Sequence, residues 1–562
     1  MKTSYCHFAA LLVLCGTTLF AAPNHQGHHP VLPIAPDGFN GAVLPLERAV
    51  PALVAKASPK DKTIRLTAWR GETVNAQCAV WTREPVRQLR FNLSVLKASD
   101  GKVLDASPRA AFVSEVQAKG AWVPDIADTL SHVNLTTNGY RAVWYWLAVP
   151  RSAVPGTYRG TVDFRAADGK TVTFPIELQV LSAALPEKND FFLDLWQHPF
   201  AVARYHDVTP FSPEHYALME PIWRELASAG QRTITVSIQD LPWGHQNYDP
   251  YWNFIKIERD SKGNFSYDFS RFDEYVEFAH RCGLGPDIHC YSIVTWGNRH
   301  FYYDKETGDH RYITAVSGSP EHTAFWTPFL KAFERHVVAK GWGDCTYIAL
   351  DERSLDETKA ALNLIQRVAP RLKLSMACNR PPRAFAEYRI DDFCVVLNHV
   401  DPAYEQEAQA RAKKGFTSTY YVCCSPARPN TFTTSPLHDG IWLGVYAAAH
   451  RLSGFLRWAF VNWPKSPREN SDFGNWPTGD TYLFYPNNRP SLRWLMLKDG
   501  IEEARKLNHI RSIRPDLVDG MRKVLGMLEY KRVEQVSDEQ IGADVAAIRL
   551  AIEKAARGLP AK

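Results

Sequence analysis

The chain has 562 residues, of which 45% are hydrophobic, so it can bury a large core and is long enough for more than one domain. Its formal net charge is +5, and Lys and Arg are dispersed rather than gathered in blocks, which argues against a nucleic-acid partner. Aromatic residues make up 12% of the chain and include 17 Trp, which suits both a large β-rich core and the stacking of rings against sugars.

Residues 1–22 have the features of a secretory signal peptide. Lys2 supplies a positive charge, an apolar segment begins at Phe8, and Ala21-Ala22 mark the cleavage region. No later run approaches the ~20 apolar residues of a membrane helix. The sequence therefore predicts an exported protein, periplasmic or extracellular, with no membrane span. Residues 23–36, rich in Pro and His, are interpreted as a linker.

Residues 37–185 carry short β-branched and aromatic runs separated by turn residues, as in RAVWYWLAVP and GTYRGTVDFRAADGKTVTF. Ala167-Asp168-Gly169 is typical of a hairpin turn. This pattern predicts an N-terminal antiparallel β-sandwich. The segment ALPEKND, 184–190, marks its end.

Residues 190–510 alternate between apolar strand patterns and amphipathic helices. The eight predicted strands cover 191–196, 231–238, 285–293, 345–350, 371–378, 391–398, 415–422 and 454–460. Ser212 and Ser270 are placed as caps of two intervening helices. Eight such repeats favour a (β/α)₈ barrel, with an open doubly wound sheet as the rival. Residues 511–562 are predicted to form a helical C-terminal segment.

Two adjacent acids, Asp351 and Glu352, end the fourth predicted strand. Catalytic groups of a barrel lie at the carboxyl ends of its strands. Because side chains of a continuing strand alternate between faces, both acids reach one pocket only if the strand ends or bulges after Leu350. Like charges this close also push the two pKa values apart, which suits an acid and a charged partner with different tasks.

Polar and aromatic residues follow the other strands, a ring that suits a polyhydroxylated ligand. The ring includes Trp296 and Asn298 after the third strand and both Tyr420 and Tyr421 in the seventh. From it we predict these substrate contacts: Trp196, His198, Trp243, Asn379, Asn398, Tyr420, Trp458, Asn462 and Trp463.

Neighbouring carboxylates do not easily flank a sugar from both sides, as the two acids of ordinary glycosidases do at ~5–5.5 Å or ~6.5–9.5 Å. They fit a scheme in which a 2-acetamido group of the substrate attacks its own anomeric carbon. Glu352, with the longer reach, is then the general acid at raised pKa, and Asp351 is the ionised group that orients the acetamido N–H.

The chain resembles glycoside hydrolase family 123 over most of its length after residue 22. The resemblance rests on VWYWLAVPRSAVPGTYRGTVDF, YIALDE and GFLRWAFVNWPKSP, with SLRWLMLKDGIEEAR near the end. It implies a β-sandwich followed by a (β/α)₈ barrel, an Asp-Glu pair at Asp351 and Glu352, and β-N-acetylgalactosaminidase activity with retention. It also supports Tyr420, Asn398, Trp458 and Asn462 as pocket residues and adds Asp480.

Three alternatives stay open. A β-N-acetylglucosaminidase of hexosaminidase type shares an adjacent Asp-Glu pair, and a non-catalytic carbohydrate-binding protein could use the same barrel. Metal-assisted hydrolysis is disfavoured because no His-Glu-x-x-His or comparable ligand spacing is present. We therefore expect no metal and no cofactor, and an amino-sugar glycan as the partner. The eight cysteines after residue 22 have no paired spacing and are expected to be free thiols.

Overall fold

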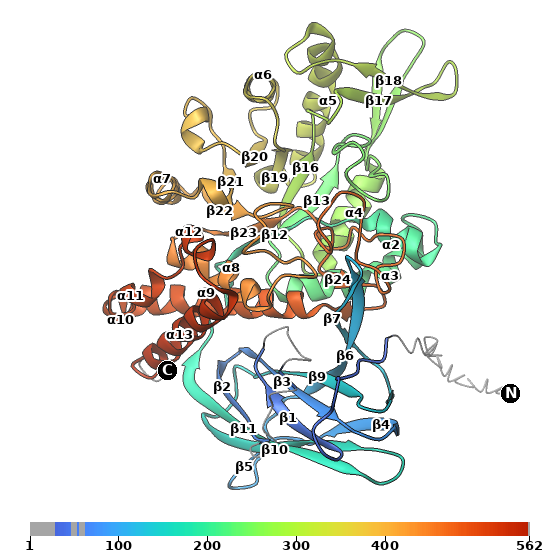
Figure 1. Ribbon diagram of the computed structural model, residues 1–562. Helices are drawn as coiled ribbons and strands as arrows, with labels where there is room; N and C mark the ends of the chain where they lie inside the picture. Colours follow the sequence, from blue (N-terminus) through green and yellow to red (C-terminus); the bar gives the residue numbers. More distant parts are fainter. Residues whose placement is uncertain (1–27, 47–52, 55–61, 560–562) are drawn as a thin grey trace, which may run out of the picture.

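The computed structural model describes residues 28–46, 53–54 and 62–559, and Figure 1 shows a β-sandwich packed beneath a larger α/β domain. The predicted signal peptide lies outside the described residues. Three C-terminal helices, α8 (His438–Ala449), α9 (Leu492–Ile513) and α13 (Asp538–Ala556), lie on the side of the larger domain that faces the sandwich (Figure 1). The predicted order of sandwich, barrel and terminal helices is confirmed.

The sandwich has two sheets. The first has the order β1-β3-β9-β6-β7 and contains β1 (Asn40–Leu44), β3 (Thr73–Trp81), β9 (Tyr140–Ala148), β6 (Arg109–Ala118) and β7 (Ala121–Asp128). The second has the order β2-β11-β10-β4-β8 and contains β2 (Ile64–Arg70), β11 (Thr171–Ala184), β10 (Gly156–Arg165), β4 (Val86–Leu93) and β8 (Val133–Leu135). The short β5 (Lys97–Ala98) pairs with β10.

The second sheet departs from the prediction at one edge. There β2 pairs parallel to β11, whereas β10 pairs antiparallel with both β11 and β4. The chain leaves β2 at Gly71 and enters the opposite sheet as β3, so these two consecutive strands do not form a hairpin. The hairpin predicted at Ala167-Asp168-Gly169 does form, and Gly169 has the positive φ of +85° that favours glycine in such a turn.

The larger domain contains an eight-stranded parallel sheet whose strands follow one another in chain order around a nearly closed barrel. They are β12 (Phe192–Leu195), β13 (Thr233–Ser237), β16 (Asp287–Tyr291), β19 (Thr346–Leu350), β20 (Lys373–Cys378), β21 (Asp392–Val396), β22 (Thr417–Tyr421) and β23 (Gly454–Arg457). The sheet runs β12-β23-β22-β21-β20-β19-β16-β13. The gap between its two end strands is bridged by Arg232 N, which donates to Leu193 O at 2.8 Å. The barrel prediction is confirmed over the open-sheet rival.

Helices cover the outside of the barrel: α2 (Pro199–His206), α3 (Pro213–Ser228), α4 (Ser270–Arg281), α5 (Pro320–Ala339), α6 (Leu355–Val368) and α7 (Pro402–Ala412). Ser212 caps α3 as predicted, because its hydroxyl accepts from His215 N at 3.2 Å. The cap predicted at Ser270 is wrong. Ser270 is the first residue of α4, and its hydroxyl and backbone N–H instead bond Asp268 before the helix.

A four-stranded sheet that the sequence did not predict is inserted into the barrel. Its order is β15-β14-β17-β18, with β14 (Lys256–Arg259), β15 (Phe265–Asp268), β17 (Arg299–Asp304) and β18 (Asp309–Thr314). The β17–β18 hairpin projects at the upper right of Figure 1. Phe265 packs edge-on against Phe325 of α5 at 5.1 Å, so one face of this sheet is buried on a barrel helix.

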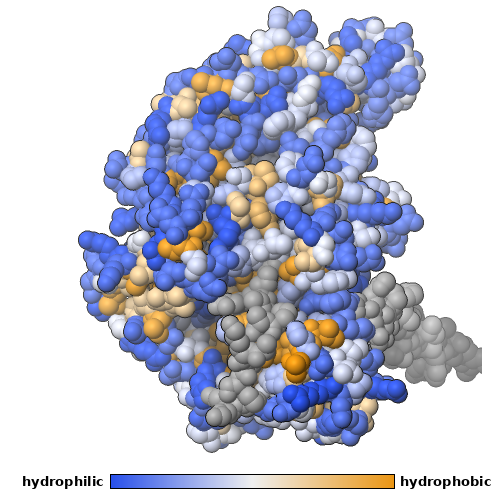
Figure 2. Space-filling view, viewed as in Figure 1, coloured by the Kyte–Doolittle hydropathy of each residue, from blue (hydrophilic) through white to orange (hydrophobic). Residues whose placement is uncertain are grey.

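The chain ends in helices α9, α10 (Pro515–Gly520), α11 (Arg522–Leu525), α12 (Tyr530–Val533) and α13. Helix α9 passes through residue 510, so the boundary predicted there does not coincide with the end of an element. Hydrophilic side chains predominate on the face shown in Figure 2. Among the described residues no helix has both the length and the apolarity needed to span a bilayer.

Candidate active site

Asp351 and Glu352 lie at the mouth of the barrel, immediately after β19 ends at Leu350. The strand therefore stops at the residue where the sequence required it to stop. Asp351 Oδ1 accepts a hydrogen bond from Glu352 N at 2.8 Å, and Oδ2 accepts from Trp296 Nε1 at 3.1 Å. The Glu352 carboxylate accepts from the hydroxyl of Tyr421, the last residue of β22. Within the same mouth, Asp351 thus contacts the loop after β16 and Glu352 contacts the end of β22.

The pKa of Asp351 is raised to about 6, because burial disfavours its charged form and the nearby Glu352 charge adds to this effect. The N–H groups of Glu352 and Trp296 oppose the rise by bonding to the carboxylate. The raised pKa therefore falls on the acid that sequence reasoning made the ionised partner. At pH 7 most Asp351 side chains are nonetheless charged, since the pKa lies below that pH.

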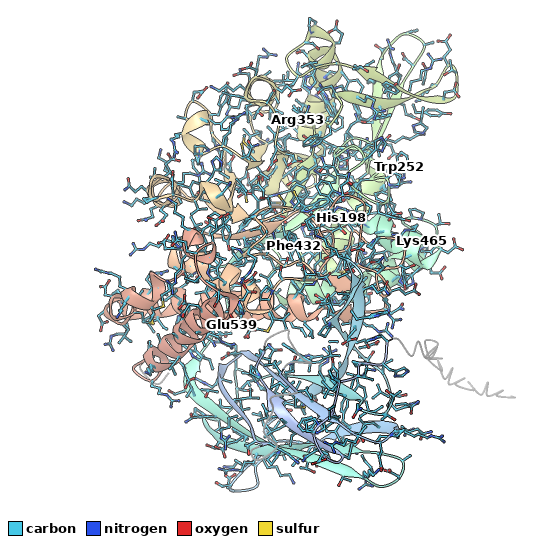
Figure 3. The ribbon with its side chains drawn as sticks, in the orientation of Figure 1. His198, Trp252, Arg353, Phe432, Lys465 and Glu539 are labelled. Carbon is cyan, nitrogen blue, oxygen red and sulfur yellow. The ribbon has the colours of Figure 1, made fainter. Side chains whose placement is uncertain are left out.

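Trp296 is fixed on two sides. Its indole N–H bonds Asp351, and the guanidinium of Arg353 lies over its ring at 5.1 Å from the ring centre. Arg353 in turn donates to Asn298 Oδ1 at 3.3 Å and to Glu357 at 3.0 Å. Figure 3 labels Arg353 on the upper part of the barrel. This chain of contacts holds the indole N–H at the Asp351 carboxylate.

Three predicted residues, Trp196, His198 and Trp243, meet in a buried aromatic floor. Trp196 stacks on Trp243 with ring centres 5.1 Å apart, and both contact Tyr291, at 4.5 Å and 5.1 Å. His198, labelled near the centre of Figure 3, packs edge-on against Trp458 at 6.4 Å. Burial lowers the pKa of His198 to about 4, so its imidazole is neutral at pH 7.

The remaining predicted residues are placed differently. Asn379 and Asn398 are exposed just after β20 and β21. Asn462 donates from its amide to Asn247 at 3.1 Å and Trp463 donates to Phe484 O at 2.6 Å, so both hold neighbouring loops together. Asp480 is fully buried and forms an ion pair with Arg457 at 2.7 Å, which gives it a structural partner of its own.

The structure does not bring Tyr420 to the acids. Its side chain points outward from β22, and its hydroxyl donates to Leu443 O of α8 at 2.5 Å. Tyr421 takes the inward position, in register with Val396 and Leu456 of the neighbouring strands. The sequence predicted a substrate contact at Tyr420, whereas the structure places its neighbour Tyr421 beside Glu352. The two-residue period of a strand is the signal that separates the two side chains.

Trp476 is a further aromatic residue that the sequence did not single out. Its ring lies 5.4 Å from Trp458, and its indole N–H donates to Gln246 O at 3.1 Å. It belongs to the loop 464–483, which precedes the short strand β24 (Phe484–Tyr485) and is bonded to the sandwich. Gln117 of β6 donates to Glu469 O at 3.0 Å and accepts from Ser471 N at 2.9 Å. The sandwich thus positions one wall of the barrel mouth.

Two clusters of potential metal ligands occur among the described residues; the first contains a histidine, and the second is in contact with basic side chains. In the barrel interior the His289 ring lies between Asp194, at 3.5 Å from Nδ1, and Asp392, at 3.9 Å from Nε2. The two acids face opposite nitrogens of the ring, so each can pair with one N–H of a protonated imidazole. A single metal ion could contact only one of these nitrogens. Burial would lower the pKa of His289, but the two carboxylates raise it above its ordinary value.

The second cluster, Glu72, Asp499 and Glu503, lies between sandwich and barrel. Lys506 occupies its centre, with Nζ 2.5 Å from Glu72 and 3.0 Å from Glu503. Arg549 adds a further contact to Asp499 at 3.1 Å. The acids are therefore neutralised by basic side chains of the same chain.

A parallel barrel with two neighbouring carboxyl groups at its mouth and aromatic rings beneath them defines a glycan-cleaving hydrolase. Residues 196–510 match the model of the Glycoside hydrolase 123, catalytic domain, and residues 52–166 match that of the Glycoside hydrolase 123 N-terminal domain. The chain belongs to glycoside hydrolase family 123. The resemblance found in the sequence is thereby confirmed.

A family 123 glycoside hydrolase from Clostridium perfringens, described for its hydrolysis of glycolipid glycans, has a similar structure. The TM-score is 0.84 at 26% identity, and the match covers 93% of this chain and 98% of that one. A GH5 xyloglucanase from Bacteroides ovatus matches at a TM-score of 0.29 and 9% identity, over 80% of this chain and 99% of the other, which supports no argument. A search of curated protein sequences finds no match.

Proposed function

We propose that this glycoside hydrolase removes β-linked N-acetylgalactosamine from glycans with retention, and that the substrate's acetamido oxygen is the nucleophile. The observation that carries the proposal is the end of β19 at Leu350, which puts two consecutive carboxyl groups at one barrel mouth. Consecutive acids are poorly placed to act from opposite sides of a sugar, whereas substrate assistance needs only one proton donor and one charged orienter.

In the first step the acetamido oxygen attacks the anomeric carbon, and the glycosidic oxygen leaves with a proton from Glu352. Asp351 accepts the acetamido N–H and stabilises the positive charge of the cyclic oxazolinium ion. In the second step Glu352 takes a proton from water, which attacks the same carbon and reopens the ring. Two displacements restore the original configuration.

The environment of each acid supports these roles. Asp351 is held by two N–H donors, from Trp296 and from the Glu352 backbone, which favour its charged form and fix its orientation. The pKa of about 6 leaves it charged at neutral pH, as an orienting group must be. Glu352 contacts a single neutral hydroxyl, that of Tyr421, among the described residues.

The raised pKa of Asp351 also favours a second candidate, in which Asp351 donates the proton and Glu352 orients the amide. Substrates with good leaving groups distinguish the two, since such substrates need no proton. If Asp351→Asn is rescued by a dinitrophenyl leaving group and Glu352→Gln is not, the roles are reversed.

The function is tested with aryl β-glycosides of N-acetylgalactosamine, N-acetylglucosamine and galactose. We expect the first to be cleaved fastest, galactoside to be resistant because it lacks the amide, and NMR to show the β-anomer as the first product. A preference for the gluco sugar would make the protein a β-N-acetylglucosaminidase. Rapid cleavage of the galactoside, or a first product with α configuration, would exclude substrate assistance.

We further propose that the protein is exported, on the basis of residues 1–22. Fractionation of the producing cells tests this, with mass spectrometry of the mature N-terminus. A full-length chain that begins at Met1 and stays in the cytoplasm would contradict it. A wild-type protein that binds amino-sugar glycans but turns none of them over would instead favour the non-catalytic carbohydrate-binding alternative.

A further inference from the structure

The inserted β17–β18 hairpin begins at the active site itself. Trp296, which donates to Asp351, lies three residues before Arg299, the first residue of β17. Ala315 N donates to Asn298 O at 2.9 Å and closes the base of the hairpin. Gln239, which follows β13, accepts from Phe301 N at 2.9 Å. The hairpin is therefore fixed to the barrel mouth at the ends of two neighbouring strands.

The strand register gives this hairpin two different faces. His300 and Tyr302 of β17 are buried, and His300 accepts from Trp326 Nε1 of α5 at 3.2 Å. Arg299, Phe301 and Tyr303 alternate with them on the opposite face. Only the first face is therefore needed to pack the insertion against the barrel.

The outward face carries aromatic rings, bordered by Arg299 at one end and by Lys256 of β14, whose Nζ lies 5.3 Å from the centre of the Tyr303 ring, at the other. Phe301 is paired with Tyr312, with ring centres 5.3 Å apart, and Tyr312 is 52% exposed. The guanidinium of Arg299 lies 5.9 Å and 5.7 Å from these two rings. Tyr303 and His310 form the next pair along the strands, at 5.6 Å. The result is an aromatic stripe that starts beside Trp296.

We propose that this stripe, Phe301, Tyr312 and Tyr303 with Arg299, binds the leaving part of the substrate, as a stacking platform for a neutral oligosaccharide. Sugar rings offer apolar C–H faces that pack on aromatic rings, while the guanidinium donates to hydroxyl groups. The stripe is continuous with the loop that holds Asp351, which is why the occupant is the same glycan chain and not a separate ligand. The inference rests on the proposed function for the identity of the cleaved sugar.

Such a platform contributes binding energy at a distance from the reacting bond. An extended substrate has sugar units that reach the platform, whereas a short substrate does not. The test therefore compares kcat/KM for two substrates: 4-nitrophenyl β-N-acetylgalactosaminide and a neutral tetrasaccharide that ends in the same sugar. Tyr312→Ala and Phe301→Ala should each lower kcat/KM on the tetrasaccharide by about five- to tenfold. Neither should change the value on the aryl glycoside by more than about twofold.

Arg311→Ala is the matched control. Arg311 is exposed on the same strand as Tyr312 but pairs with Tyr302, so its side chain belongs to the opposite face, where it contacts Asp304 at 3.6 Å. It should leave both substrates unaffected. Equal losses on both substrates in the aromatic variants would show that the hairpin only supports Trp296, and no loss on either would show that the stripe binds no sugar.

Two further measurements separate the remaining outcomes. If the losses appear only when the glycan is attached to ceramide in phosphatidylcholine vesicles, the stripe contacts lipid and the oligosaccharide proposal is overturned. If the wild-type protein cleaves no aryl N-acetylhexosaminide, the proposed function fails. The present inference is then tested by calorimetry, with the trisaccharide that forms the leaving part of the tetrasaccharide as the ligand. Tyr312→Ala should weaken that binding by at least about fivefold, and unchanged binding would overturn it.

Discussion

The carboxylates of two regions, the junction between the domains and the barrel mouth, have different partners. Between sandwich and barrel, Asp125 contacts Arg493 at 2.9 Å and Asp128 contacts Arg489 and Arg468. At the barrel mouth, Asp351 and Glu352 are held by an indole N–H, a backbone N–H and a hydroxyl. A guanidinium partner satisfies an acid permanently, whereas neutral donors leave its charge available to a substrate. Under the proposed function, the acids at the junction hold the fold together and the acids at the mouth act on the substrate.

The largest expected effect is at the mouth. Asp351→Asn and Glu352→Gln should each lower kcat on an aryl N-acetylgalactosaminide by about 10²–10⁴-fold, while thermal unfolding changes little. Under the proposed roles, a dinitrophenyl leaving group should restore much of the rate of Glu352→Gln and little of that of Asp351→Asn. If kcat were unchanged in both variants, the acids at the mouth would have no catalytic role that sets them apart from the acids at the junction.

The junction should respond in the opposite way. Arg493→Met removes the buried ion pair with Asp125, so the free energy of unfolding should fall by about 3–5 kcal/mol. Denaturant unfolding measures this. The control is Arg522→Met, which breaks an exposed pair with Asp519 at 2.9 Å and should lower stability by less than about 1 kcal/mol. Equal effects of both variants would contradict the structural role of the Asp125 pair.

The pH dependence of kcat/KM sharpens the comparison. The pKa of Asp351 in the free protein is about 6, so protonation below that pH removes the charge that the mechanism needs. We expect activity to fall about tenfold per pH unit below the pKa. Trp296→Phe removes a donor to the charged form, so the fall should begin at higher pH. A profile that does not respond to Trp296→Phe would show that another group titrates.

The smallest effect compares two neighbouring tyrosines. Tyr421→Phe removes the hydroxyl that contacts Glu352 and should lower kcat by about five- to tenfold with little change in melting temperature. Tyr420→Phe leaves Leu443 O without its donor and should lower stability by about 1 kcal/mol with kcat unchanged. Reversed effects would mean that β22 presents its other face to the mouth.

The barrel could be predicted because its strands are buried at almost every residue and appear in the sequence as short runs rich in β-branched, aromatic and aliphatic residues between amphipathic helices. Each predicted strand overlaps the observed one, although β23 ends at Arg457 rather than at residue 460. The inserted sheet was missed because β14 and β18 carry charged residues, such as Lys256 and Asp309, at exposed positions. The sequence pattern of such strands resembles that of polar turn segments.

Within the candidate site, the sequence placed both acids at the barrel mouth because their position depends only on where β19 ends. The sequence did not show that Asn462, Trp463 and Asp480 have protein partners, because those partners depend on the tertiary fold. Asn462 contacts Asn247, and Trp463 contacts Phe484 across the following loop. Whether such a residue lines a pocket or supports the loops around it depends on the three-dimensional packing.

The attachment of loop 464–483 to the sandwich has a consequence for any attempt to produce the barrel by itself. Backbone bonds from Gln117 reach Glu469 and Ser471, while Trp476 and Asp480 of the same loop lie beside the barrel mouth. A barrel produced without residues 37–185 would lose both the backbone partner of that wall and the acids that pair with Arg489 and Arg493. Any transfer of this mouth to another scaffold should therefore include the β6–β7 hairpin.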